Sequence, residues 1–463
     1  MLCGELRYKN LKTMKINRID GRKNSSLVRR EISVLRERLS SRGNIVSEAG
    51  RQRTIEIFGE AISPQQVVER ICCDIRVSGL KALLDYTLRV DGAELTSKTI
   101  RITKNELAAA HRKADAKFLD SIRFAGKNIR TFQEKILRNK NVSWKIGGGY
   151  IRERYRPLRR VGVCVPGGAA AYPSTILMTI IPAQVAGVNE IAVMMPPTKL
   201  GAYNVDMLAV CRELGVSEVY RMGGAQGVAA FAYGVDGITA VDKIVGPGNM
   251  FVSLAKRFVN GDVGIDMIAG PSELVVIVDG ATNPAFVAYD ILAQAEHSPG
   301  VCIIVGWDEK AVDTLVNTIA KEFSKFERGD LAKTSLEKFG AIIIAKDESD
   351  ACKITDLIAP EHLIIAAQNA ELLADKILNA GAIFVGSYSP AAVGDYAAGP
   401  SHVLPTSGTA RFANGLTCND FLKSSSVMSF SKKGLAAYAD CVESLSGKEG
   451  LTAHGESVAA RLR

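Results

Sequence analysis

Two kinds of hydrophobic spacing divide the chain near residue 160. Before that point apolar residues recur three and four positions apart, as in Val67, Val68 and Ile71, which is typical of amphipathic helices. The pattern predicts a helix that begins after Ser63 and is broken at Gly79, and a second helix over about 105–137. After Trp144 it predicts a turn followed by an extended strand.

Beyond residue 160 short apolar runs alternate with helical segments. The first four runs are VGVCV, EIAVMM, EVYRM and DKIV, and a second series from Glu273 contains ELVVIVD, VCIIVGW, GAIIIA and GAIFVG. Strands that alternate with helices imply parallel sheets with right-handed crossovers. We therefore expect an α/β fold with two Rossmann-like units side by side. Ligands of such sheets bind beyond the carboxyl ends of the strands.

These patterns suggest a division of the chain into four parts. Residues 1–60 form a peripheral N-terminal segment. Residues 61–160 and 272–407 form a first α/β domain with the candidate metal and catalytic residues, and residues 161–271 form a second with the candidate cofactor loops. Residues 408–463 form a helical, polar tail.

Composition indicates a soluble enzyme with an ample core. The chain has 463 residues, of which 47% are apolar, and it lacks an uninterrupted apolar run of roughly 18 residues that could span a membrane. The nine cysteines are scattered and form no CxxC pair. This usage favours a reducing compartment, and hence the cytoplasm, over a disulfide framework.

Charge is unevenly distributed. Residues 1–160 carry 36 basic and 17 acidic side chains, whereas the remainder carries 22 and 32. A basic third can bind nucleic acid, but this one has neither interleaved aromatic residues nor a recognition motif. A solvated face, or a surface that docks on an acidic part of a partner subunit, explains it better. We therefore expect neither a nucleic-acid nor a membrane partner.

Histidines are few and unevenly placed. Four of the five lie in the last 170 residues, each beside polar side chains. Gln294 and His297 are three positions apart near the end of a predicted helix, so both project from one face. An amide oxygen and an imidazole there can hold a metal, although the pair alone is equally consistent with an ordinary helix end and a surface histidine.

Three glycine-containing turns follow predicted strands directly. They are Pro166-Gly167-Gly168, Gly223-Gly224-Ala225-Gln226 and Gly246-Pro247-Gly248-Asn249. Glycine lets the backbone approach a ligand, and a helix that starts there offers free N–H groups to phosphate. Any one of them alone is explained as a tight turn, and none is a GxGxxG fingerprint. Three on one sheet edge favour a nucleotide or another anionic ligand.

Five motifs in this order resemble the histidinol dehydrogenase family. They are VGPGNMFVSLAKRFVNGDVGIDMIAGPSELVVIVD, LAQAEHSPG, APEHL, GDYAAGPSHVLPTSGTARF and EGLTAH, and the resemblance covers roughly residues 60–463. It implies a zinc-dependent homodimer that oxidises L-histidinol to L-histidine with two NAD⁺, at the end of histidine biosynthesis. The active sites would be shared between the subunits.

The resemblance also implies roles for single residues. Glu361 and His362 would be the catalytic acid–base pair, although a lone Glu-His after Pro360 would pass for an ordinary loop. The zinc ligands would be Gln294, His297, Asp395 and His454. Contacts with substrate would come from these six residues together with Ser272, His402 and Glu449. His454 and Glu449 would reach the neighbouring subunit's site.

For the cofactor, the resemblance implies NAD contacts at Gln226, Asn249 and the position of Cys164. Family members usually carry a tyrosine at that last position, so Cys164 is a departure that bears on NAD affinity. Ser78-Gly79-Leu80 also departs from the family's usual Gly-Asp pair. A rival hypothesis is an enzyme of the same fold that oxidises another alcohol, such as a sulfonated diol. His402, Glu449 and His454 favour histidinol.

Overall fold

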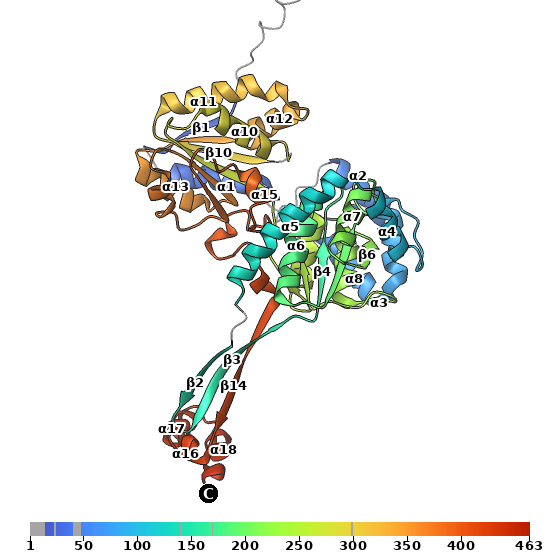
Figure 1. Cartoon of the computed structure of the whole chain (residues 1–463), viewed down its shortest axis with the longest axis vertical. Coiled ribbons are helices and arrows are strands. Elements are labelled where there is room, and N and C mark those ends of the chain that lie inside the picture. The colour runs from blue at the N-terminus through green and yellow to red at the C-terminus, as the bar shows by residue number, and fades with distance from the viewer. Residues whose placement is uncertain (1–13, 23–24, 40–47, 139–140, 169, 298–299) are drawn as a thin grey trace, which may run out of the picture.

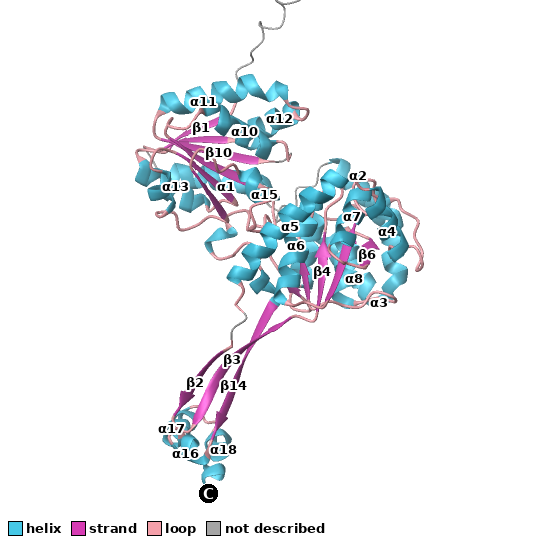
Figure 2. Ribbon diagram, in the orientation of Figure 1, coloured by secondary structure: helices cyan, strands magenta, loops and turns pink. Residues whose placement is uncertain are grey.

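Two parallel sheets and an antiparallel arm make up the structure (Figures 1 and 2). The computed structural model describes residues 14–22, 25–39, 48–138, 141–168, 170–297 and 300–463. The predicted fold class, two α/β units with parallel sheets, is confirmed. No helix in this described part of the chain combines the length and apolar character needed to cross a membrane.

The first unit is built on a six-stranded parallel sheet. In spatial order its strands are β1 (Asn17–Asp20), β11 (Ala341–Ile344), β10 (Val301–Gly306), β9 (Glu273–Val278), β12 (His362–Ala366) and β13 (Ala382–Val385). The sequence pattern predicted four of them and missed β1 and β12. β1 is short and pairs only at the sheet edge with β11, and β12 begins inside the segment that passes for a loop after Pro360.

Helices cover both faces of the six-stranded sheet. One face carries α10 (Pro284–Ala295), α11 (Glu309–Glu322) and α12 (Gly329–Phe339), and the other carries α1 (Ser25–Leu39), α13 (Glu348–Ile358) and α14 (Ala370–Ala374). A short helix, α15 (Ala391–Tyr396), packs against α10. The segment 1–60 was predicted to be peripheral, but in its described part β1 and α1 belong to this layer and Ile19, Val28 and Ile32 enter the core. Residues 1–13, 23–24 and 40–47 of that segment lie outside the described residues.

The second unit is built on a five-stranded parallel sheet. Its strands, in spatial order, are β6 (Glu218–Arg221), β5 (Glu190–Met195), β4 (Arg160–Cys164), β7 (Lys243–Val245) and β8 (Gly264–Ile265). The chain starts in the middle at β4, builds outward to β6 and then returns to β7. This reversal of strand order beside β4 places a crevice at the carboxyl edge of the sheet.

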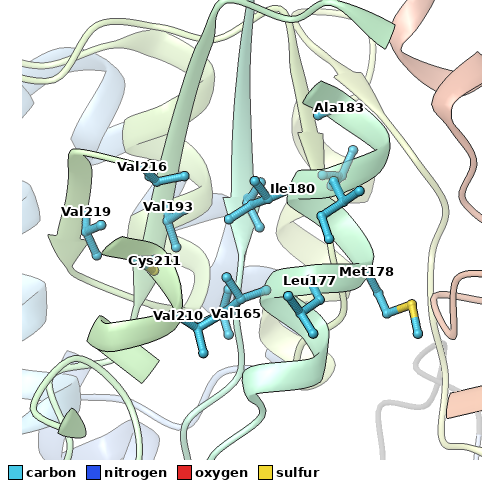
Figure 3. Close-up of a cluster of buried hydrophobic side chains, with 14 of the residues drawn as sticks. Val165, Leu177, Met178, Ile180, Ala183, Val193, Val210, Cys211, Val216 and Val219 are labelled. Atoms are coloured by element: carbon cyan, nitrogen blue, oxygen red, sulfur yellow. The ribbon is translucent and has the colours of Figure 1, made fainter. Parts of the chain in front are cut away.

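Helices also cover both faces of the five-stranded sheet. One face carries α4 (Lys104–Lys113), α5 (Ala116–Ile136), α6 (Pro173–Ala186) and α7 (Val205–Glu213), and the other carries α3 (Pro64–Asp91), α8 (Gly224–Tyr233) and α9 (Met250–Val259). Figure 3 shows Leu177 and Ile180 of α6 directed toward Val165 and Val193 of the sheet, a contact that closes the first of these two cores.

This packing corrects the predicted grouping of residues 61–160 with 272–407. The apolar side of α3, with Val67, Val68 and Ile71, is buried with α8 and α9 on the five-stranded sheet. A short helix, α2 (Glu48–Phe58), packs against α3. The helices before residue 138 therefore belong with residues 160–265, and amphipathic periodicity alone cannot tell a helix which of two sheets it will cover.

The helices before the first sheet were predicted in outline. α3 has a non-helical residue at Gly79, with φ of 56°, as the glycine break predicted. The single helix expected over 105–137 is two helices, α4 and α5. Asp115 separates them because its carboxylate accepts a hydrogen bond from the amide of Lys117 at 3.1 Å and so caps the start of α5.

An antiparallel arm extends away from both units (Figure 1). Its sheet contains β2 (Val142–Ile146), β3 (Gly149–Pro157) and β14 (Leu422–Phe430), and it ends in α16 (Lys432–Ala436), α17 (Ala439–Lys448) and α18 (Thr452–Leu462). The hairpin of β2 and β3 matches the predicted turn and strand. The tail after residue 408 is not wholly helical as expected, because β14 pairs along the full length of β3.

Several basic side chains of the N-terminal third pair with acidic side chains of the remainder. Arg18 contacts Glu309 at 3.2 Å, and Arg123 contacts Glu213 at 2.7 Å. Arg160, nearly buried at the base of β4, bonds to Glu190 and Glu218. Part of the predicted charge asymmetry is therefore neutralised within the folded chain.

Candidate active site

A cleft of about 770 Å³ lies between the two sheets. One wall comes from the carboxyl edge of the five-stranded sheet, including Cys164 and the loop of Gly167 and Gly168. The opposite wall comes from the amino edge of the six-stranded sheet, where Ser272 precedes β9 and His362 begins β12. The expectation that ligands lie beyond carboxyl ends of strands therefore describes the first wall and is wrong for the second.

Glu361 is fixed on the amino-edge wall by two hydrogen bonds. Its Oε2 accepts from the Ser272 hydroxyl at 2.7 Å and from the Glu273 amide at 2.8 Å. The side chain is almost fully buried, at 6% exposure, yet it lines the cleft. Hydrogen bonds to a carboxylate are among the strong ones, so they hold one orientation of the group. Ser272, predicted from the resemblance alone, is thus in direct contact with Glu361.

His362 lies between two carboxylates. Its Nε2 is 3.1 Å from Oδ1 of Asp395, and its Nδ1, which has no hydrogen-bond partner among the described residues, is 3.6 Å from Oε2 of Glu361. The ring stacks on Phe384. Burial acts to lower the pKa of His362, but the charge of Glu361 and the bond to Asp395 outweigh it and raise the pKa to about 10.

Asp395, near the end of α15, is the centre of a group of histidines. Burial acts to raise the pKa of its carboxyl group, but the bond to His362 and the charges of His402 and His297 lower it. His402 contacts the Asp395 carbonyl oxygen through Nδ1 at 2.8 Å and the Thr175 hydroxyl through Nε2 at 3.2 Å. A carbonyl can only accept, so Nδ1 carries the proton. Burial lowers the pKa of His402, which favours this neutral ring.

Two of the four predicted metal ligands, His297 and Asp395, line the cleft, whereas Gln294 does not. Gln294 lies in the last turn of α10 and is buried, and its Nε2 has no hydrogen-bond partner among the described residues. The helix ends at Ala295, so His297 lies in the turn beyond it, exposed and lining the cleft with Asp395. The predicted common helical face is therefore not formed, because α10 ends two residues before His297.

The fourth predicted ligand is far from this group in its own chain. His454 belongs to α18, which lies at the end of the arm (Figure 1), and Glu449 precedes this helix. Neither residue lines the cleft. Within the described ranges, no three His, Cys, Asp or Glu side chains lie close enough together to hold a metal ion. One chain alone thus supplies an amide, an imidazole and a carboxylate, which is an incomplete set for a four-ligand site.

Two of the three predicted NAD contacts lie on the cleft wall formed by the five-stranded sheet. Cys164 ends β4 and lines the cleft, and burial raises the pKa of its thiol to about 12, so it is present as a neutral thiol. Asn249 also lines the cleft and caps α9 through bonds to the amides of Phe251 and Val252, both at 3.1 Å. Gln226 is buried and does not line the cleft.

A buried ion pair holds the loop that carries Asn249. Lys256 pairs with Asp266 and also donates to the carbonyl oxygen of Gly246 at 3.0 Å. Oδ2 of Asp266 accepts from the Gly246 amide at 2.7 Å. Gly246 has φ of 103°, and a Cβ there would lie 2.2 Å from the carbonyl oxygen of Cys164, so no larger residue fits. The ion pair thus holds Gly246 through both its N–H and its C=O group.

Sequence reasoning missed the roles of four residues. Lys256 and Asp266 stand inside the motif quoted for the resemblance, so a buried Lys-Asp pair ten positions apart could have been sought there. Asp91 and Thr175 line the cleft but belong to helices with no local motif. A parallel sheet with glycine turns that faces a Glu-His-Asp cluster across one cleft is consistent with an α/β oxidoreductase.

Comparison with known proteins identifies the family within that class. The family model described as histidinol dehydrogenase matches residues 59–462. The chain is 54% identical over 447 residues to the histidinol dehydrogenase of Rhodopirellula baltica, with 96% of this chain and 97% of the relative covered. It is 42% identical over 400 residues to that of Bacillus subtilis, with 86% and 93% covered. The chain belongs to the histidinol dehydrogenase family.

A solved structure supports the same assignment. The histidinol dehydrogenase of Elizabethkingia anophelis is similar to this chain with a TM-score of 0.85 and 32% identity, and the match covers 96% of this chain and 98% of that one. The match therefore extends over both α/β units and the arm. It places the whole architecture, and not one sheet alone, in this family.

Proposed function

We propose that the protein is an L-histidinol dehydrogenase. It oxidises L-histidinol to L-histidinal and then to L-histidine, transferring one hydride to each of two NAD⁺, in the final steps of histidine biosynthesis. The observation that supports this most directly is the pair of Glu361 and His362 on one wall of the cleft, opposite the glycine turns of the other wall. Membership of the histidinol dehydrogenase family supports L-histidinol as the substrate.

His362 would accept the proton of each reacting hydroxyl. In the first oxidation a hydride leaves carbon for NAD⁺, and the alcohol proton passes to His362. The aldehyde then adds water, and the resulting diol loses the second hydride and a proton to give the acid. An imidazole that accepts a proton must be neutral, and a cation held at Asp395 would favour that state by weakening one of the two carboxylate interactions that raise the pKa of His362.

Glu361 would act on the water. Its Oε2 is held by Ser272 and the Glu273 amide, which leaves Oε1 for the cleft. A carboxylate in this position can orient water for attack on the aldehyde carbon and take its proton. The distinct environments of Glu361 and His362 therefore support distinct roles, the first in hydration and the second in both proton removals.

We propose Gln294, His297, Asp395 and His454 of the partner subunit as ligands of one Zn²⁺. The approach of His297 to Asp395 at the cleft fits such a group, and Gln294, buried in the last turn of α10, would contribute its amide oxygen. When bound, zinc supplies orientation of the substrate nitrogens and takes no electrons. Within this chain His402 and Ser272 would complete the substrate pocket.

The proposed dimer follows from the arm. Glu449 and His454 are remote from the cleft of their own chain, and the arm exposes apolar side chains, including Trp144 at 47%, Met428 at 62% and Leu445 at 60% exposure. Such an arm can bury these side chains against a second copy and deliver Glu449 and His454 to its cleft. The free cysteines, which are typical of a reducing compartment, support the cytoplasm as the setting we propose.

The activity is tested by NADH formation. Purified protein with L-histidinol and NAD⁺ should form two NADH per histidinol consumed, and histidine should accumulate. A sulfonated diol serves as the competing alcohol, and the His362→Asn variant shows which signal depends on the site. NADH formation from the diol but not from histidinol would replace the proposed substrate with another of the same reaction class.

The metal is tested separately. Chelation should abolish turnover, added Zn²⁺ should restore it, and His297→Ala should lower the zinc content of the purified protein. His111→Asn is the matched control, since His111 pairs with Glu213 at 2.6 Å on the outer helices and does not line the cleft. Full zinc content in His297→Ala would remove that residue from the ligand set.

Subunit complementation tests the shared site. Mixing inactive His362→Asn and His454→Ala chains gives heterodimers in which one cleft has both wild-type residues. With free exchange about a quarter of wild-type activity should return, since half the dimers are mixed and each has one intact site. Mixing His362→Asn with Glu361→Gln is the control and should restore nothing, because every cleft keeps one defect. No recovery in the first mixture, with exchange demonstrated, would overturn the shared site.

A further inference from the structure

Asp91 is a carboxylate that lines the cleft outside the catalytic cluster, on the side of the five-stranded sheet. It is the last residue of α3, it lines the cleft, and its Oδ2 accepts a hydrogen bond from Nε2 of Gln226 at 2.9 Å. The other carboxylates on the walls, Glu361 and Asp395, belong to the catalytic cluster. Gln226 is 1% exposed, so its amide acts on the cleft only by orienting Asp91.

The position of Asp91 fits one part of a dinucleotide. Sheets that start at a central strand and reverse beside it bind the pyrophosphate at the first turn, here after β4, and usually place an acidic residue after the second strand to bind a ribose hydroxyl. Here β5 is followed by Pro196 and Pro197, with no acidic residue. A Cβ at Gly223 would lie 3.1 Å from Pro196, so the start of α8 with Gln226 adjoins the end of β5.

Asp91 therefore lies at the sheet edge where that acidic residue is usually found. It comes from α3, which precedes the alternating strands and helices of this unit. We propose that Asp91 accepts hydrogen bonds from the hydroxyls of the adenosine ribose and selects NAD⁺ over NADP⁺. The inference rests on the proposed function and names the residue that sets its cofactor preference. The 2′-phosphate of NADP⁺ would bring a second negative group against this carboxylate, whereas a ribose diol offers it two donors.

The local energetics are consistent with a binding role. Burial raises the pKa of Asp91 to about 6, even though the bond from Gln226 acts to lower it. Ionisation of this side chain therefore costs the free protein stability at neutral pH. A residue kept for packing alone would not carry that cost, whereas a bound ribose would supply donors that favour the charged form.

Asp91→Asn is the informative variant. Asparagine has the same shape and keeps an oxygen that can accept from Gln226. Because charge-assisted hydrogen bonds to the ribose are lost, KM for NAD⁺ should rise about tenfold to a hundredfold. The ratio of kcat/KM for NAD⁺ to that for NADP⁺ should decrease. KM for histidinol should not rise, and the melting temperature should not fall. Asp85→Asn, on the same helix but paired with Arg89, is the control.

A second measurement begins with the wild-type enzyme. ADP-ribose and its 2′-phosphorylated form are compared as competitive inhibitors against NAD⁺ in the wild-type enzyme. ADP-ribose should bind at least about tenfold more tightly, and Asp91→Asn should reduce that difference. Unchanged cofactor preference in Asp91→Asn, or equal inhibition by the two ribosides in wild type, would overturn the inference. Absence of NADH formation by the wild type would instead overturn the proposed function.

Discussion

Removing one partner of the buried ion pair of Lys256 and Asp266 should destabilise the five-stranded unit by about 3–5 kcal/mol. The two side chains are 3% and 1% exposed, so solvent cannot compensate for the loss of either charge. Lys256→Met removes the cation and keeps most of the apolar stem. Asp266 would then remain buried with only the amides of Gly246 and Met267 as donors. Breaking a buried pair in this way costs about 3–5 kcal/mol.

The loss should appear in both stability and cofactor binding. The free energy of unfolding, from urea titrations followed by circular dichroism, should fall by about 3–5 kcal/mol in Lys256→Met. KM for NAD⁺ should also rise, because the loop from Gly246 to Asn249 loses the bond that Lys256 makes to its first carbonyl oxygen. KM for histidinol should change little, since the catalytic cluster lies on the other sheet.

Two further variants separate charge from packing. Lys256→Met combined with Asp266→Asn removes both charges and should recover part of the lost stability. Lys243→Met is the matched control, because Lys243 donates to the carbonyl oxygen of Asp420 at 2.6 Å and not to a carboxylate. A loss below about 1 kcal/mol in Lys256→Met, or a double variant less stable than the single one, would refute the argument from an uncompensated charge.

Three other outcomes are expected. His362→Asn should slow the oxidation of both histidinol and histidinal by roughly 10²- to 10⁴-fold, measured as separate NADH-forming half-reactions. Glu361→Gln should slow the histidinal step more than the histidinol step, and equal slowing would remove the case for separate roles. The raised pKa of Asp91 means that the protein is most stable, at this group, below pH 4 and loses that stability as pH rises through about 6. Asp91→Asn should thus melt higher than wild type at pH 8, by about 1–3 kcal/mol in stability, and the two should converge near pH 4.

Local patterns predicted the parallel sheets well, because each strand is a short apolar run between turns. They failed at β1, whose four residues read NRID and gain strand geometry only by pairing with β11. They also assigned α3 to the wrong sheet, since the same apolar stripe could cover either. Which surface a helix covers is decided by contacts between residues far apart in the chain, here α3 with α8 and α9.

The candidate site was predicted from motifs more than from spacing. The structure places Ser272, Glu361, His362, Asp395 and His402 on one wall, a grouping that no local pattern contains, since these residues span 131 positions. Gln294 and His297 are close because they are close in sequence, but the end of α10 gives them different exposure. Asp91 could not be predicted, because its role depends on the hydrogen bond from Gln226, 135 positions away.

The arm has a consequence for synthesis of the chain. The central strand β3 pairs with β2 locally, but its other edge waits for β14, whose residues emerge more than 260 positions later. During that interval β3 is an exposed edge, the kind of surface that recruits strands of other chains. Arg152, Arg154 and Arg156 alternate along it with Glu153 between. Charged side chains on an unpaired edge oppose pairing with strands of other chains. We therefore expect these arginines to lower the tendency of the nascent chain to aggregate before β14 is synthesised.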